Sequence, residues 1–208
     1  MQIVSPTGSL EAYREQAEQS CGITTILCHP HPQYGGSMHD AVLQTTADAC
    51  LAAEVDVIRF NFRGVGESSG QFNNGIGEVD DLLAVTNWAR EAHPQTSIWW
   101  MGYSFGAAVV WRALVSQTQI APTLSILIAP PLGMMDITAA PVNTSPVFAI
   151  AGDQDTYVDT SILAGWSNVT AHTIGGADHF FSAHHKELEH QVSRILTSTQ
   201  NGRCPIAP

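Results

Sequence analysis

The chain has 208 residues, of which 44% are hydrophobic and 13% are charged, a composition typical of a folded globular protein rather than a disordered one. Its 19 Asp and Glu residues against 8 Lys and Arg residues give a formal net charge of -11. Such an acidic surface repels phosphate backbones and anionic lipid headgroups. We therefore expect neither a nucleic acid nor a membrane as a partner.

The cysteines and the N-terminus favour a cytoplasmic location. Cys28 and Cys50 lie in apolar runs, which indicates buried free thiols. The first residues lack the basic start and apolar stretch of a secretory signal, and no run approaches the roughly 18 apolar residues that span a bilayer. The four cysteines are scattered, without metal-ligand spacing: Cys21, Cys28, Cys50 and Cys204.

The predicted strands are short runs of β-forming residues. The first two flank a turn at 6–8 and resemble a hairpin whose strands lie at the edge of the sheet. Most later runs are apolar throughout, as expected for parallel strands covered on both faces. These later strands are predicted at 24–28, 55–60, 98–101, 124–128, 147–151 and 169–174.

Segments of helical periodicity separate these strands. Asp40 is placed to cap the first of them, and three acidic residues begin the second, where a helix N-terminus favours negative charge. Alternating strands and helices predict a single doubly wound α/β domain over 1–198, followed by a tail at 199–208. The helices are predicted at 40–53, 78–92, 104–117 and 182–196, with a shorter one near 160–166.

A G-x-S-x-G motif occupies 102–106, between the apolar run 97–101 and a helix start. A sharp strand-to-helix turn holds the serine of this motif in a strained conformation, and a side chain at either flanking glycine would clash. The hydroxyl of Ser104 then stands beside a helix N-terminus, whose N–H groups favour developing negative charge. Ser104 is therefore the candidate nucleophile.

Two further loops supply a carboxylate and an imidazole. The strand at 147–151 leads into a loop with Asp153 and Asp155, and the strand at 169–174 leads to His179. The chain order of serine, aspartate and histidine is the order in which the triad occurs in α/β-hydrolase folds. In such a triad the histidine removes the serine proton, and the buried carboxylate holds the imidazole in the required tautomer.

The chain resembles the α/β-hydrolase superfamily, in particular its small lidless dienelactone-hydrolase-like and esterase-like members. The resemblance implies an α/β-hydrolase fold with helices on both faces of a mostly parallel sheet and without a cap domain. It also makes Asp155, the fourth residue of a G-x-x-D pattern, the acid of the triad. The matching motifs are CHPHP at 28–32, RFNFRGVGES at 59–68, GYSFG at 102–106, GDQD at 152–155 and GADH at 176–179.

The segment after the first parallel strand resembles an oxyanion loop of the His-Gly-x-Pro type. By that resemblance the backbone N–H groups of His31 and Phe105 stabilise the oxyanion. The chain departs from the usual pattern because Pro30 replaces glycine, and neither Pro30 nor Pro32 has an N–H to donate. Other amides of this loop could donate instead, namely those of Gln33, Tyr34, Gly35 and Gly36.

We expect apolar side chains after the strand 124–128 to form the wall of a substrate pocket. The segment 129–146 is too short for the helical cap that the family often inserts there, which predicts an open site. The predicted pocket residues are Tyr34, Leu132, Met134 and Met135.

No cofactor or metal is expected. His29, His31 and His39 lie close in sequence, but two histidines separated by a proline rarely face one metal ion, so we expect His29 to brace the oxyanion loop by hydrogen bonding. The glycine-rich segment 64–70 lacks the spacing of a dinucleotide-binding loop.

Together these patterns predict a serine hydrolase that cleaves a small ester or related acyl compound through an acyl-serine intermediate. The partner is a small acyl substrate, and the chain is expected to be a monomer or a homodimer. Two alternatives remain open. The same triad could serve a peptidase, amidase, thioesterase or acyltransferase, or the fold could be a binding protein that has lost efficient catalysis.

Overall fold

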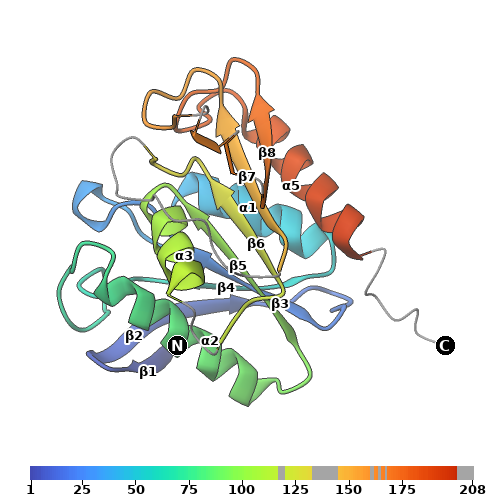
Figure 1. Cartoon of the computed structure of the whole chain (residues 1–208). Coiled ribbons are helices and arrows are strands. Elements are labelled where there is room, and N and C mark those ends of the chain that lie inside the picture. The colour runs from blue at the N-terminus through green and yellow to red at the C-terminus, as the bar shows by residue number, and fades with distance from the viewer. Residues whose placement is uncertain (117–119, 133–144, 160–161, 164, 167, 201–208) are drawn as a thin grey trace.

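The computed structural model describes residues 1–116, 120–132, 145–159, 162–163, 165–166 and 168–200 (Figure 1). In this part of the chain one eight-stranded sheet forms the centre, in the order β1-β2-β4-β3-β5-β6-β7-β8. The hairpin β1–β2 lies at one edge and pairs antiparallel with β4, and every later pair is parallel. The strands are β1 (Gln2–Ser5), β2 (Gly8–Glu15), β3 (Ile23–Cys28), β4 (Asp56–Phe60), β5 (Ser97–Tyr103), β6 (Leu124–Ile128), β7 (Val147–Gly152) and β8 (Val169–Ile174).

Helices cover both faces of the sheet, as predicted for a doubly wound α/β fold. α1 packs against α5 on one face, and α2 packs against α3 on the other. No separate cap lies over the sheet among the residues that the structure describes, and the doubly wound α/β architecture expected from the sequence is confirmed. The helices are α1 (Ala41–Ala52), α2 (Gly77–Ala92), α3 (Phe105–Val115) and α5 (His185–Gln200), with a short 3-10 helix η1 (Pro32–Tyr34).

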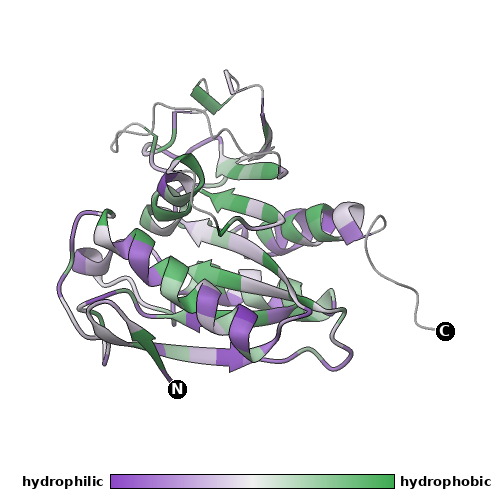
Figure 2. Cartoon of the chain, turned by 60° about the horizontal axis from the view of Figure 1, so that its bottom comes forward, coloured by the Kyte–Doolittle hydropathy of each residue, from purple (hydrophilic) through white to green (hydrophobic). Residues whose placement is uncertain are grey.

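The central strands are buried because they are apolar on both faces. Adjacent strand residues point to opposite faces, yet Trp99 and Trp100 on β5 are both fully buried. The Trp100 indole donates a hydrogen bond of 3.0 Å to the hydroxyl of Thr86 on α2, so this large side chain is buried without an unsatisfied donor. Figure 2 shows the hydrophobic strands between helices whose outer faces are hydrophilic.

The predicted helix ends need small corrections. Asp40 caps α1 as predicted, with its carboxylate accepting the N–H groups of Val42 at 2.8 Å and Leu43 at 3.3 Å. α5 continues through Gln200, two residues beyond the predicted end of the domain, because the Gln200 amide donates to the Ala53 carbonyl at 2.8 Å. Residues 160, 161 and 164 of the short helix predicted near 160–166 lie outside the described residues, and 162–163 are helical. No helix in the described part of the chain is both long and apolar enough to cross a membrane.

A buried ion pair fixes the loop after β4 against α2. The Arg63 guanidinium donates to both carboxylate oxygens of Asp81 at 2.8–3.1 Å, and the Arg63 backbone N–H donates to the same carboxylate at 3.0 Å. Asp81 is fully buried. The loop after β4 is thus held to α2 by charge-assisted hydrogen bonds.

Replacing Asp81 with alanine is expected to lower the free energy of unfolding by about 3–5 kcal/mol, because the Arg63 charge would remain buried without its partner. Asp80→Ala is the matched control. The Asp80 carboxylate is 59% exposed and lies 4.0 Å from the same guanidinium, so its loss should change stability by less than about 1 kcal/mol. Urea unfolding of both variants measures the difference, and equal losses would contradict this role of Asp81.

Candidate active site

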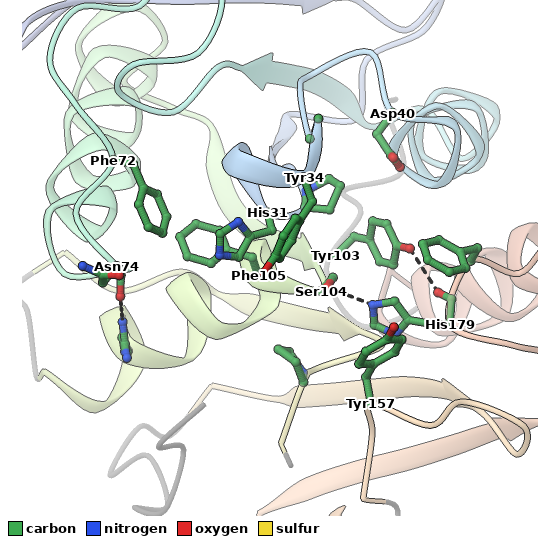
Figure 3. A pocket seen from close by; sticks show the side chains of 16 residues that line it. His31, Tyr34, Asp40, Phe72, Asn74, Tyr103, Ser104, Phe105, Tyr157 and His179 are labelled. Carbon is green, nitrogen blue, oxygen red and sulfur yellow. Dashed lines mark hydrogen bonds between the residues drawn. The ribbon is translucent and has the colours of Figure 1, made fainter. Parts of the chain in front are cut away.

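The three loops singled out in the sequence meet at one edge of the sheet. Because β5, β6, β7 and β8 are parallel neighbours, their carboxyl ends lie on the same side. The His179 Nε2 lies 2.9 Å from the Ser104 hydroxyl (Figure 3). Its Nδ1 lies 2.7 Å from a carboxylate oxygen of Asp155. A hydroxyl, an imidazole and a carboxylate thus form one hydrogen-bonded chain.

Ser104 occupies the strained turn that the glycine spacing predicted. Its backbone has φ 53° and ψ −117°, a conformation that residues with a side chain rarely adopt. A Cβ at Gly102 would lie 2.3 Å from the Gly106 carbonyl oxygen, and a Cβ at Gly106 would lie 2.1 Å from the Cys28 carbonyl oxygen. Both glycines are therefore required, and α3 begins one residue later than predicted.

The hydrogen bonds of the two acidic residues distinguish Asp155 from Asp153. The Asp155 carboxylate is buried and accepts the backbone N–H of Tyr157 at 2.8 Å as well as the imidazole. A carboxylate at Nδ1 holds the proton on that nitrogen and leaves the Nε2 lone pair facing the Ser104 hydroxyl. Asp153 is exposed and instead accepts the N–H of Gly176 at 2.7 Å, which ties two loops together.

The backbone amides of His31 and Phe105 are free to face a ligand. None of the hydrogen bonds in the described part of the chain uses either N–H. The alternative donors of this loop are all engaged within the loop itself: Gln33 donates to the His31 ring, Tyr34 and Gly36 donate to the His31 carbonyl, and Gly35 donates to the Pro32 carbonyl. The His31 and Phe105 rings lie 5.0 Å apart, so the two residues are neighbours.

His29 braces the start of this loop, as the sequence predicted. Its imidazole is fully buried, donates from Nδ1 to the Pro30 carbonyl at 2.7 Å and accepts the Phe62 N–H at Nε2 at 3.0 Å. Burial lowers the pKa of His29 to about 4, because a charged imidazole would be desolvated there. His29 is thus neutral, and each of its ring nitrogens forms a hydrogen bond. No group of three or more possible metal-ligating side chains occurs among the described residues.

A cavity of about 750 Å³ opens over the Ser104 hydroxyl. Tyr34 lies at this pocket as predicted, and its side chain is 85% exposed. The prediction for Leu132 is wrong, because its side chain is buried in the core and the neighbouring Pro131 lines the pocket instead. Met134 and Met135 lie outside the described residues.

Several pocket residues escaped the sequence analysis. They come from the loops after β3, β6, β7 and β8, from the loop before α2, from the end of β5 and from α3. Of these residues, the sequence pattern could have indicated Arg112, which lies seven residues after Phe105 and hence on the same face of α3. Tyr103 adds a brace, its hydroxyl donating to the His179 carbonyl at 3.1 Å. The pocket residues that were not predicted are Pro30, Gly35, Gly36, Asp40, Phe72, Asn74, Tyr103, Arg112, Pro131, Tyr157 and Phe180.

Comparisons with known proteins agree with this geometry. A family model described as the α/β hydrolase fold matches residues 26–122. The structure of an α/β serine hydrolase homologue from Coxiella burnetii is 34% identical, with a TM-score of 0.87, and the match covers 94% of this chain and 96% of that one. The chain belongs to the α/β-hydrolase family. The resemblance noted in the sequence is thereby confirmed.

Two further relatives of this α/β hydrolase span most of its length. A serine hydrolase without a lid from Xanthomonas campestris is 33% identical, with a TM-score of 0.87, and the match covers 100% of this chain and 95% of that one. An uncharacterized protein from Rickettsia prowazekii (strain Madrid E) is 30% identical over 210 residues, covering 94% of this chain and 87% of that one. Membership of the α/β serine hydrolases supports a hydrolase activity.

The buried His29 predicts a pH dependence of stability in this α/β hydrolase. Its pKa is about 4 in the folded state and about 6.5 in an unfolded chain, so between these values only the unfolded state binds the proton. His29 therefore stabilises the fold above about pH 6.5, and this contribution falls as the pH falls. From pH 7 to pH 5 the loss is roughly 2 kcal/mol.

Urea unfolding of the wild type and His29→Gln at both pH values tests this dependence, because the glutamine amide does not titrate. The stability advantage of the wild type should shrink by roughly that amount at pH 5. An advantage that stays constant between the two pH values would show that His29 does not titrate as its burial requires.

Proposed function

We propose that this α/β hydrolase cleaves small carboxylic esters through an acyl-serine intermediate. The observation that carries the proposal is the hydrogen-bonded chain from Ser104 through His179 to Asp155. The Ser104 oxygen attacks the ester carbonyl carbon while His179 Nε2 takes the hydroxyl proton. Asp155 stabilises the resulting imidazolium and keeps its Nδ1 proton in place.

Two backbone amides stabilise the tetrahedral intermediate. The N–H groups of His31 and Phe105 carry no other hydrogen bond in the described part of the chain, and the rings of the two residues lie 5.0 Å apart. As the carbonyl oxygen becomes negative, it accepts both N–H groups, and the N-terminus of α3 adds a favourable dipole. Because these donors are fixed before the substrate binds, no reorganisation is needed during the reaction.

The second half of the reaction reverses the proton transfers. His179 gives its proton to the departing alcohol oxygen as the bond between that oxygen and the carbonyl carbon breaks, which leaves the acyl group on Ser104. Water then enters the open pocket, loses a proton to Nε2 and attacks the acyl carbon. Collapse of the second tetrahedral intermediate releases the acid and returns the proton to the Ser104 oxygen.

Ser104→Ala tests the proposal. The variant should lose turnover of 4-nitrophenyl butyrate by at least about a thousandfold, because no nucleophile remains, while its unfolding curve stays close to that of the wild type. A fluorophosphonate probe should label the wild type and not the variant. Retained hydrolysis in Ser104→Ala would refute the proposal, and a wild type that neither reacts with the probe nor turns over any acyl ester would favour a binding protein.

The assignment of Asp155 as the acid that contacts His179 is tested separately with Asp155→Asn. An amide at this position favours the wrong imidazole tautomer, so kcat should fall by about a thousandfold to ten-thousandfold. Asp153→Asn is the matched control, because Asp153 is exposed and contacts only the loop at Gly176 and its neighbour Gln154. Comparable losses of kcat in the two variants would contradict the assignment of Asp155.

A further inference from the structure

The pocket over Ser104 has opposite charges at its two ends. Figure 3 shows Asn74, whose carbonyl accepts a hydrogen bond from Arg112, at one end of the pocket, Asp40 at the other, and Ser104 between them. Arg112 is the one Lys or Arg among the described residues that line the pocket. A substrate that spans the pocket therefore meets a cation on one side of the scissile bond and a carboxylate on the other.

The Arg112 guanidinium is held near the nucleophile and keeps spare donors. Its Nη1 donates a hydrogen bond to the Asn74 carbonyl. A Cβ placed on Gly75 would lie 2.5 Å from Arg112 Nη1 and 3.4 Å from Phe105 Cε2, so the guanidinium and the Phe105 ring both lie close to Gly75. The side chain thus bends back along α3 toward Ser104. No ion pair with a carboxylate is formed by this guanidinium within the described residues. Of its five N–H donors, one is used by a residue that the structure describes.

Among the described residues, none of the neighbouring charged groups forms an ion pair with this cation. The Glu78 carboxylate in the first turn of α2 accepts the backbone N–H groups of Asn73 and Gly75, each at 2.7 Å. Arg63 is paired with Asp81. Burial lowers the pKa of His31, which disfavours a second positive charge beside Arg112. Arg112 is therefore the cation available to a ligand at this end.

Aromatic rings line the path from the nucleophile to Arg112. The ring centroids of Phe72 and Phe105 lie 5.6 Å apart, and the His31 ring lies 5.0 Å from each of them. These rings offer an apolar wall to a hydrocarbon chain. A chain that follows this wall ends at the guanidinium, whose planar donors match a carboxylate. A dianionic phosphate would bring a second charge that nothing here neutralises.

The catalytic geometry places this subsite on the acyl side. In the proposed reaction His179 protonates the leaving alcohol, so the alcohol departs on the side of His179, where Tyr157 and Phe180 contact the imidazole ring at centroid distances of 4.8 and 5.5 Å. Arg112 lies on the other side of Ser104, along α3. The carboxylate of Asp40 disfavours an anion at the leaving-group end.

We infer that Arg112 is a specificity-determining residue that selects esters whose acyl group ends in a carboxylate, that is, monoesters of dicarboxylic acids. This inference rests on the proposed ester hydrolysis and adds the class of acyl group. It also explains how a chain with a net charge of -11 binds an anionic substrate, since one local guanidinium supplies the attraction that the overall charge does not.

The test compares 4-nitrophenyl hydrogen adipate with its uncharged methyl ester, 4-nitrophenyl methyl adipate. The wild type should show the higher kcat/KM for the acid, and added NaCl should reduce that preference. Arg112→Gln should lower the ratio of the two kcat/KM values by about tenfold to a hundredfold, because a charge-assisted hydrogen bond is lost. Arg112→Lys should retain part of the preference, and Arg90→Gln, a change of an arginine outside the pocket, should retain all of it.

Each other outcome overturns the inference. A wild type that prefers the methyl ester, or an Arg112→Gln variant in which both substrates slow equally, would mean that Arg112 only holds the Asn74 loop. If 4-nitrophenyl methyl adipate is cleaved in a Ser104-dependent way and the acid is not favoured, this inference fails while the proposed ester hydrolysis stands. If neither ester is cleaved, or if cleavage survives in Ser104→Ala, both fail.

Discussion

The site depends on the close packing of the Ser104 turn against the end of β3. Gly106 lies so near the Cys28 and His29 carbonyls that a Cβ there would clash with both, at 2.1 and 2.8 Å from their oxygens. This contact brings the amide of Phe105 and the loop that carries His31 to the same place, and it leaves Ser104 with φ 53°. The candidate nucleophile and its proposed oxyanion donors are thus positioned by one steric constraint.

The buried polar groups around this contact are nearly all satisfied, which makes the site rigid. His29 uses both ring nitrogens, Asp155 accepts a backbone N–H besides the imidazole, and the Arg63–Asp81 pair holds the loop that contacts His29. Such networks hold side chains in one arrangement because breaking any bond leaves a buried group unsatisfied. The pocket end near Arg112 differs, since its guanidinium keeps donors that no described residue uses.

The strands, the helices and the Ser104 turn could be predicted from the sequence because each depends on a local pattern of residues. Apolar runs and helical spacing locate the strands and helices, and G-x-S-x-G needs its glycines at fixed positions. The pocket wall depends instead on contacts between distant segments. Phe72 reaches the pocket because Glu78 binds two backbone amides of the preceding loop, and Leu132 turns into the core after Ala129, which has φ 45°. Neither the bonds from Glu78 to the preceding loop nor the left-handed conformation of Ala129 was predicted from residue type.

The most direct measurement of the central claim is a crystal structure of the protein after reaction with a 4-nitrophenyl alkylphosphonate. The account predicts a covalent bond from Ser104 Oγ to phosphorus, with the phosphoryl oxygen about 2.7–3.1 Å from the backbone nitrogens of His31 and Phe105. His179 Nε2 should remain within hydrogen-bonding distance of an oxygen on phosphorus. An unmodified Ser104, or an adduct whose phosphoryl oxygen faces neither amide, would contradict it.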